Sequence, residues 1–133
     1  MAVGFTVTRN HQWHNTTRED SGGFPHMGLQ EFLLDYFTVW GEAVDPYDGA
    51  SFSGDQLDQL IVQLQRAVTE ITPQPPSWPF STPEEVASFH VSCGIYGIER
   101  LEPRDHALKT MNRAIELARR ARQRNETLLF IGD

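Results

Sequence analysis

One amphipathic pattern with a defined start and stop constrains this chain more than any other feature. Apolar residues recur at helical spacing at Leu57, Leu60, Ile61, Leu64, Val68 and Ile71. This periodicity predicts a helix over residues 54–72 with one buried face. Ser53 and Gln56 fit a capping box at its start, and Pro73 ends it because proline disfavours helical geometry in the preceding residue. A helix with such a face must pack against another layer.

A second helix and two terminal strands are predicted in the same way. Leu108, Met111, Ile115, Leu117 and Ala118 supply the apolar face of a helix over residues 103–124, with basic residues opposite. Asn125 is typical of a left-handed C-cap. Residues 4–8 alternate like a strand, and residues 127–131 form a continuous apolar run typical of a buried strand.

Two further segments have more than one interpretation. Apolar residues at Leu29, Phe32, Leu33, Tyr36, Phe37 and Trp40 predict a helix that ends near Gly41, although the second half has the composition of a strand. Residues 82–85 form a second capping box and predict a short helix. Residues 88–98 are then expected to form a strand, because apolar side chains alternate from Phe89 to Ile95.

Together these elements predict a single α+β domain over residues 1–133. A small sheet of about three or more short strands, from the two terminal strands and a middle one, is covered by two or three amphipathic helices. Residues 1–27 are expected to form a strand and a polar loop, and residues 28–133 the helical and sheet body. Five of the eight prolines fall in residues 73–83, which predicts a stiff, extended connector held by Trp78 and Phe80.

The composition and the net charge limit the cellular location of the protein and the class of ligand that it can bind. No apolar run approaches the roughly 20 residues that span a bilayer, and the first residues lack the pattern of a secretory signal. Cys93 is the sole cysteine, which favours a reducing cytoplasm. The net charge of −7 disfavours nucleic acid, because phosphates would be repelled. We therefore expect a cytoplasmic protein that is a monomer or a weak homodimer.

No residue set predicts catalysis, a metal or another cofactor. The histidines at 11, 14 and 26, with His90 and Cys93, could supply zinc ligands, but they lack the paired spacing of zinc sites. His90 and Cys93 would face opposite sides of the expected strand, which separates a nucleophile from its base. The sequence thus predicts a protein that is not an enzyme. A small enzyme or metal-binding protein using the histidine-rich N-terminal loop is the alternative.

Charge is divided between two parts of the chain. Residues 20–65 hold eight carboxylates and no Lys or Arg, whereas residues 99–124 hold eight basic residues and four acidic ones. Carboxylates and aromatic residues are interleaved over residues 40–58, and such a mixture can steer and anchor a basic protein. We expect partner binding by Trp40, Glu42, Asp45, Tyr47, Asp48, Asp55 and Asp58. The alternative is that these charges serve solubility alone.

A small, acidic, cysteine-poor α+β domain without a catalytic motif resembles the immunity proteins that bacteria make against secreted toxins. The resemblance is one of type and extends over residues 28–133. It implies a tight complex with a cognate toxin, often a nuclease, whose basic groove the acidic segment would fill. A phage or secretion-system adaptor with a different protein partner is the remaining alternative.

Overall fold

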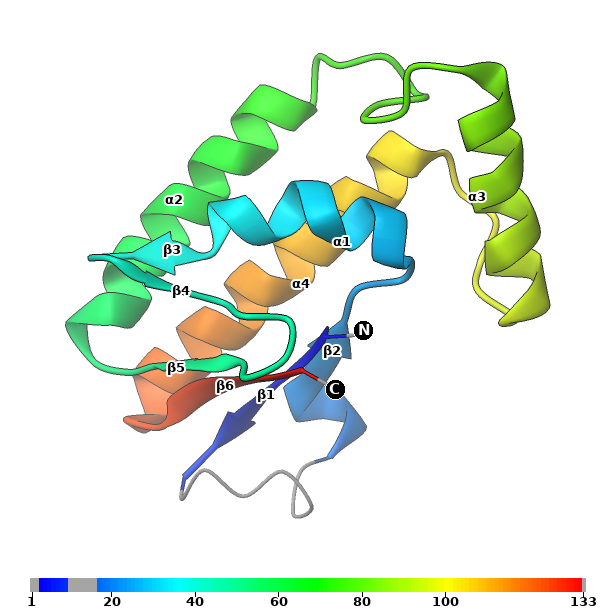
Figure 1. Cartoon of the computed structure of the whole chain (residues 1–133). Coiled ribbons are helices and arrows are strands. Elements are labelled where there is room, and N and C mark those ends of the chain that lie inside the picture. Colours follow the sequence, from blue (N-terminus) through cyan, green and yellow to red (C-terminus); the bar gives the residue numbers. More distant parts are fainter. Residues whose placement is uncertain (1–2, 10–16, 133) are drawn as a thin grey trace.

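The computed structural model describes residues 3–9 and 17–132, and every structural statement below refers to these residues (Figure 1). The helices are α1 (Met27–Leu33), α2 (Asp55–Ile71), α3 (Pro83–Ile95) and α4 (Pro103–Arg124), with 3-10 turns η2 (Arg18–Asp20) and η3 (Leu34–Tyr36). The strands are β1 (Val3–Thr8), β2 (Ser21–Gly23), β3 (Thr38–Val39), β4 (Glu42–Ala43), β5 (Ala50–Phe52) and β6 (Thr127–Gly132). The α+β class predicted from the sequence is confirmed.

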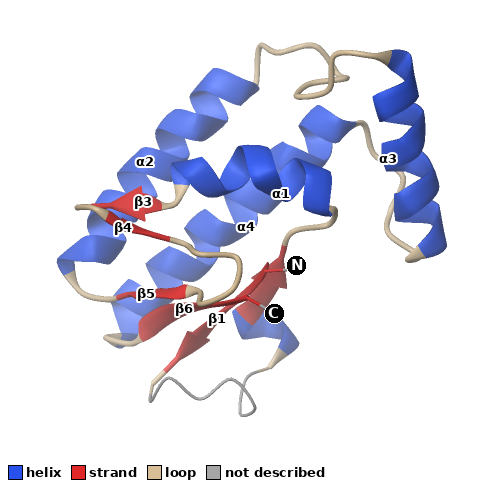
Figure 2. Cartoon of the chain, in the orientation of Figure 1, coloured by secondary structure: helices blue, strands red, loops and turns tan. Residues whose placement is uncertain are grey.

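Four strands form one antiparallel sheet in the order β2-β1-β6-β5, and β3 pairs with β4 in a separate hairpin (Figure 2). The two terminal strands are neighbours at the centre of the sheet. They pair over six residues, from Val3 opposite Gly132 to Thr8 opposite Thr127. The ends of the described chain therefore meet within the same sheet, and β5 lies on the other side of β6.

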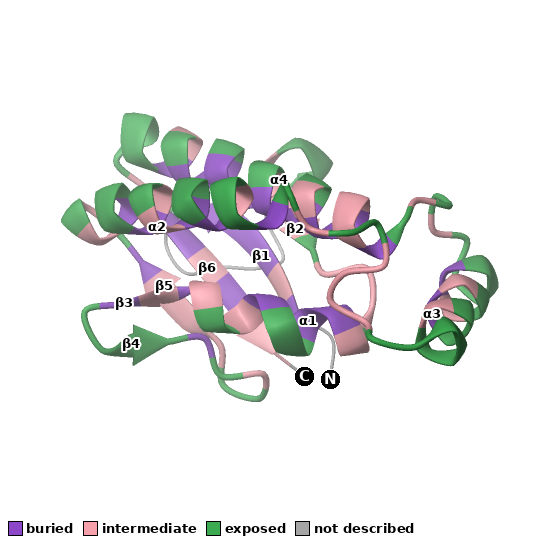
Figure 3. Cartoon of the chain, turned by 90° about the horizontal axis from the view of Figure 1, so that it is seen from above, coloured by how far each residue is buried: buried purple, intermediate pink, exposed green. Residues whose placement is uncertain are grey.

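The core lies between the sheet and the helices α2 and α4, which pack side by side (Figure 3). Phe130 on β6 is the centre of an aromatic cluster. Its ring lies 5.4 Å from that of Phe5, 5.2 Å from Phe37 and 5.6 Å from Phe52. The contacts with Phe37 and Phe52 are edge to face, which is a favourable arrangement at such distances. The cluster joins β1, β5 and β6 to the chain that follows η3.

The predicted helices at 54–72 and 103–124 and both terminal strands are confirmed. Asn125 adopts the expected left-handed conformation, with φ 55° and ψ 43°. The start of α2 differs in detail, because Gly54 rather than Ser53 is the N-cap. Gln56 still accepts the Ser53 N–H at 3.2 Å, so one half of the predicted capping box is present. Among the described residues no helix is long and apolar enough to cross a membrane.

The helix expected to run to Gly41 ends earlier. Leu33 is the last α-helical residue, η3 continues to Tyr36, and β3 follows, so the strand alternative was the better one for the second half. The apolar stripe is also incomplete, since Phe32 is 46% and Trp40 is 67% exposed. Phe37, which is fully buried in the aromatic cluster, turns the chain out of the helix.

The strand expected within residues 88–98 is wrong, because α3 continues to Ile95. Phe89 and Cys93 are buried on one face of this helix, whereas Val91 and Ile95 are exposed. The alternation in the sequence therefore comes from two apolar faces of one helix. The remaining strands of the main sheet are β2 and β5, which are only three residues long each.

The proline-rich connector is compact rather than extended. Backbone hydrogen bonds close successive turns from Gln74 to Ile71, from Trp78 to Pro75 and from Phe80 to Ser77. The aromatic rings of Trp78 and Phe80 pack against the core, as predicted. The connector thus places α3 beyond the end of α2 and α4, where it stands apart from the sheet (Figures 1 and 3).

Candidate functional site

The hairpin β3–β4 presents a tryptophan at its tip. Val39 pairs with Glu42, so Trp40 and Gly41 form a two-residue loop. Their φ values are 51° and 83°, and such hairpin loops favour positive φ and Asn-Gly sequences. Trp40 therefore adopts a left-handed conformation that costs most side chains about 1 to 2 kcal/mol. Its side chain is nevertheless directed into solvent, with 67% exposed.

Asp45 organises the turn before β5. Its Oδ1 accepts the backbone N–H of Tyr47 at 2.7 Å and that of Asp48 at 3.3 Å. The Gly49 N–H donates to the Asp45 carbonyl at 2.7 Å and closes the turn. An aspartate that bonds the backbone two residues ahead is typical of turns. The turn leaves the Tyr47 side chain 68% exposed.

Two glycines allow this turn to lie directly against β6. Gly49 has φ 76°, and a Cβ there would collide with the Phe130 carbonyl. A Cβ on Gly132 would collide in the same way with the Pro46 carbonyl. A side chain at either position would push the turn away from the strand. The position of the turn is therefore fixed by backbone contacts with the central strand.

Asp55 and Asp58, at the start of α2, are paired with α4. Arg122 lies 3.1 Å from Asp58 and 3.5 Å from Asp55. Both predicted site carboxylates are thus partly neutralised. Glu42 accepts a hydrogen bond from Gln56 Nε2 at 3.0 Å, which connects the hairpin to the same end of α2.

Other arginines of α4 hold the segment 18–21 against the helix. Arg113 donates to three backbone carbonyls of this segment. Arg120 and Arg124 bind the Asp20 carboxylate at 3.0 and 2.9 Å. Burial raises the pKa of Asp20, but the hydrogen bonds from Arg124 and Arg120 outweigh burial and the pKa is lowered. Three arginines of the basic face of α4 are therefore used in hydrogen bonds and ion pairs within the fold.

The structure divides the seven predicted site residues into two groups. Trp40, Glu42, Asp55 and Asp58 lie around the hairpin and the first turns of α2, whereas Asp45, Tyr47 and Asp48 belong to the turn on β6. In Figure 1 the hairpin and the turn lie at opposite ends of the segment 38–49. We call this segment the acidic edge. Its carboxylates form an elongated strip rather than one compact patch.

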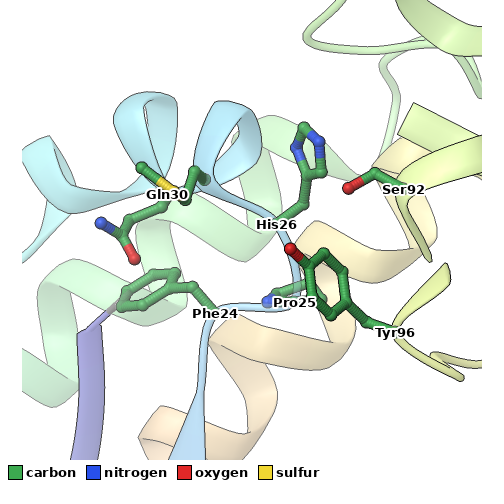
Figure 4. Close-up of a pocket in the computed structure, with 7 residues that line it drawn as sticks. Phe24, Pro25, His26, Gln30, Ser92 and Tyr96 are labelled. Atoms are coloured by element: carbon green, nitrogen blue, oxygen red, sulfur yellow. The ribbon is translucent and has the colours of Figure 1, made fainter. Parts of the chain in front are cut away.

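A second feature is a cleft of about 400 Å³ between α1 and α3 (Figure 4). It is lined by Phe24, Pro25, His26, Met27, Gln30, Ser92 and Tyr96. The Ser92 hydroxyl points toward the His26 ring, which suggests a serine–histidine pair. However, Nδ1 of His26 accepts the Gly28 N–H at 3.1 Å, so the proton of the neutral ring is on Nε2. In this tautomer His26 cannot serve as a general base through Nε2.

His90 and Cys93 share α3, which removes the argument that they face opposite sides of a strand. Their chemistry still offers no activated thiol. Cys93 is buried, and burial raises the pKa of its thiol, whereas a nucleophilic cysteine needs a lowered one. Nε2 of His90 lies 3.8 Å from Glu102. Across residues 3–9 and 17–132 no three His, Cys, Asp or Glu side chains are grouped to hold a metal ion; His11 and His14 lie outside these residues.

Two histidines, the half-buried His26 and the buried His106, contact Phe89 on the buried face of α3. The rings of His26 and His106 lie 5.1 and 5.4 Å from its ring, both edge to face. Burial lowers the pKa of both imidazoles, and a weaker backbone hydrogen bond with Glu99 raises that of His106. Nε2 of His106 has no hydrogen-bond partner within the described chain. Neutral histidines therefore form part of the surface against which α3 packs.

Comparisons with protein-family models, with curated proteins and with solved structures give no match. The sequence alone did not show that Gln56 joins the acidic edge to α2 or that Arg122 pairs with Asp55 and Asp58. Gln56 carried a signal as a capping residue, but the pairing of Arg122 with α2 depends on tertiary contacts that no local pattern reveals.

Proposed function

We propose that this protein binds a basic protein through the acidic edge and acts by occupying that partner's surface. The observation that carries the proposal is the exposure of two aromatic side chains within a strip of carboxylates. Trp40 and Tyr47 are 67% and 68% exposed, and no Lys or Arg occurs from residue 20 to residue 65. Exposed aromatics of this kind supply the anchors of protein interfaces, and charge around them guides association.

The conformation of Trp40 supports the same conclusion. A left-handed backbone at a large apolar residue is unfavourable, and exposure of the indole adds a second cost. Both costs would be removed by the Asn-Gly loop that such hairpins prefer. Residues held in costly conformations are concentrated at functional sites. A tryptophan here is therefore better explained by binding than by folding.

The type of partner follows from the charge and from the class of protein that the chain resembles. A cytoplasmic immunity protein that neutralises a basic toxin would use an acidic strip to fill the groove where the toxin binds its substrate. Such inhibition needs no catalytic residue, no metal and no cofactor in the inhibitor. It needs a preformed surface, and the contacts of the turn with β6 supply one.

The test is a kinetic binding assay with the purified product of the adjacent gene, at two salt concentrations. Glu42→Lys and Asp48→Lys should each slow association several-fold and weaken its salt dependence, since steering acts on the on-rate. Tyr47→Ala should instead speed dissociation about tenfold or more, as loss of an anchor does. Asp45 is unsuitable for this test, because its carboxylate also holds the turn.

Glu84→Lys is the matched control, since it changes net charge equally but lies on α3, at the far end of the molecule (Figure 1). It should leave both rates close to those of the unmodified protein. Equal effects of Glu84→Lys and Asp48→Lys on association would mean that overall charge, not the acidic edge, controls binding. A Tyr47→Ala variant that dissociates at the original rate would remove the turn from the interface.

A further inference from the structure

The helix α3 is attached to the rest of the fold by a narrow contact (Figure 1). Phe89 and Cys93 are its only buried residues. The ring of Phe89 lies 5.6 Å from that of Phe80 in the connector. It also lies edge to face against His26, at the start of α1, and His106 on α4. Elements with few buried apolar contacts open separately from the rest of a protein, so the attachment of α3 depends on the state of two imidazole rings.

The chain on the two sides of α3 is joined at Arg104, in the first turn of α4. The Arg104 N–H donates to the Pro76 carbonyl at 3.1 Å, and Nη1 of its guanidinium donates to the Gln74 carbonyl at 2.8 Å. These bonds fasten the start of the connector to α4 without involving α3. Residues 81–102 therefore belong to a loop that is closed at its base, and they are free to move without a change in α2 or α4.

Protonation of His26 would break a bond of the folded chain. Nδ1 of the neutral ring accepts the Gly28 N–H, which caps α1. Both nitrogens of an imidazolium carry protons, so the charged ring cannot accept this bond. The cleft beside the ring offers no compensating charge. Apart from the phenol of Tyr96, which is neutral near pH 6 to 7, none of the other side chains that line the cleft is ionisable.

Protonation of His106 would leave a buried proton without an acceptor. His106 is 3% exposed, and its Nε2 has no hydrogen-bond partner within the described chain. In the charged ring Nε2 must donate, and an unsatisfied buried donor is costly. Burial is the largest influence on this ring and lowers the pKa of His106. Glu99 acts in the opposite direction, whereas Lys109 and His90 add to the lowering.

We infer that α3 detaches from α1 and α4 when His26 and His106 gain protons in mild acid, whereas the sheet, α2 and α4 stay folded. The attached state favours two neutral rings, and the detached state exposes both rings to water. A fall in pH through about 6.5 therefore shifts the equilibrium toward the detached state. The contact of His90 with Glu102 at 3.8 Å acts against detachment, but Glu102 is half exposed and such pairs are weak.

Cys93 reports detachment, because it is the sole cysteine and is buried on the face of α3 that packs against the fold. Its rate of reaction with dithiodipyridine is measured in the full chain and divided by the rate of the urea-unfolded chain at the same pH, which removes the effect of pH on the thiol. Each histidine contributes at most about tenfold between pH 7.5 and 5.5. The ratio should therefore rise about five- to a hundredfold, and neutralisation should reverse the rise.

The dependence of labelling on urea separates detachment from global unfolding. Detachment exposes little surface, so the labelling rate should vary with urea much less than global unfolding does. Hydrogen exchange should agree, with protection reduced at pH 5.5 in residues 83–95 and retained in residues 55–71. Equal urea slopes for labelling and for global unfolding would mean that α3 opens only with the whole fold, and would overturn the inference.

His26→Asn and His106→Phe test the source of the pH dependence. Asparagine is a good N-cap and phenylalanine keeps a ring against Phe89, but neither titrates. Each variant should lower the rise at least about twofold, and the double variant should reduce it to less than about twofold. Ser92→Ala is the matched control. The Ser92 hydroxyl points toward His26 (Figure 4), so its loss changes the contact without removing a titrating group, and the rise should stay the same. An undiminished rise in both single variants would overturn the inference.

Discussion

Arg122 on α4 donates from Nε to Oδ1 of Asp58 on α2 over 3.1 Å and joins residues 64 positions apart. The same guanidinium lies 3.5 Å from Asp55. Arg122 thus holds two of the expected site carboxylates in contacts between α2 and α4. The acid-rich half of the chain therefore has two parts. Asp55 and Asp58 are neutralised by α4, whereas the carboxylates of the acidic edge remain available to a partner.

Removing this arginine should strengthen the field of the acidic edge with little effect on folding. Arg122→Gln should change the free energy of unfolding by less than about 1 kcal/mol, because both partners are substantially exposed and such pairs contribute little. Association with a basic partner should become faster and more sensitive to salt. Stopped-flow kinetics and urea denaturation measure the two effects.

Arg119→Gln is the appropriate control for that experiment. Arg119 is exposed on the same helix, and its loss changes net charge by the same amount. In the described chain it forms no ion pair whose loss would release Asp55 or Asp58. If both variants accelerate association equally, the contact of Arg122 with α2 is irrelevant to steering.

The elements that could be predicted from the sequence are those whose signals are local. The helix α2 has its apolar period and its stop at Pro73, and α4 has the same period and an asparagine C-cap. The wrong prediction of a strand where α3 lies also has a local cause. Alternating apolar residues indicate a strand only when one side is buried, whereas here both Phe89 and Val91 belong to a helix, on different faces. Exposure of the second face was not predictable from one sequence.

The candidate site could be predicted in composition but not in arrangement. The turn chemistry of residues 45–49 was evident from Pro, Asp and Gly, and the structure contains that turn. The separation of the hairpin from the turn, and the pairing of Asp58 with Arg122, depend on how the sheet places segments that are distant in the chain. The tautomer of His26 likewise depends on the N–H of Gly28, a consequence of where α1 begins.

Truncation of the α2 core face should be costly. Leu64 is fully buried, and Leu64→Ala should lower the free energy of unfolding by about 2 to 5 kcal/mol, since both transfer energy and cavity formation contribute. Val62→Ala on the exposed side of the same helix should cost less than about 1 kcal/mol. Urea denaturation followed by circular dichroism measures both. A loss below about 1 kcal/mol for Leu64→Ala would mean that α2 does not pack as described.

The half-buried His26 and the buried His106 predict loss of stability in mild acid. Burial holds the pKa of His26 and of His106 below the ordinary value of about 6.5. As the pH falls through 6.5 the unfolded chain binds protons that the folded chain does not, so the free energy of unfolding decreases until the folded pKa values are reached. Urea denaturation at pH 7.5, 6.5 and 5.5 should show this decrease.

His106→Phe should reduce that pH dependence. Phenylalanine removes a titrating group and the unpartnered Nε2 while keeping a ring against Phe89. Lys109, Glu99 and His90 also act on the charge of His106, so the comparison should be made at constant ionic strength. An unchanged slope between pH 7.5 and 5.5 in the variant would show that His106 is not a source of the acid sensitivity.

Substitution of Trp40 at the hairpin tip should have opposite effects on stability and on binding. Trp40→Asn replaces a left-handed tryptophan by the residue that tolerates this conformation best. The free energy of unfolding should therefore rise by about 0.5 to 1 kcal/mol, because backbone strain is relieved. Binding to the partner should weaken at least about tenfold, through faster dissociation, because an exposed aromatic anchor is lost.

Gly41→Ala provides the complementary control at the same loop. Gly41 has φ 83°, and its Cβ position is open to solvent, so an alanine there introduces strain without a collision. This variant should lose about 1 kcal/mol of stability while keeping Trp40. Thermal denaturation and dissociation rates of both variants separate the two roles of the loop. A Trp40→Asn protein that is less stable, yet binds with the original dissociation rate, would show that the indole supports the fold and does not anchor a partner.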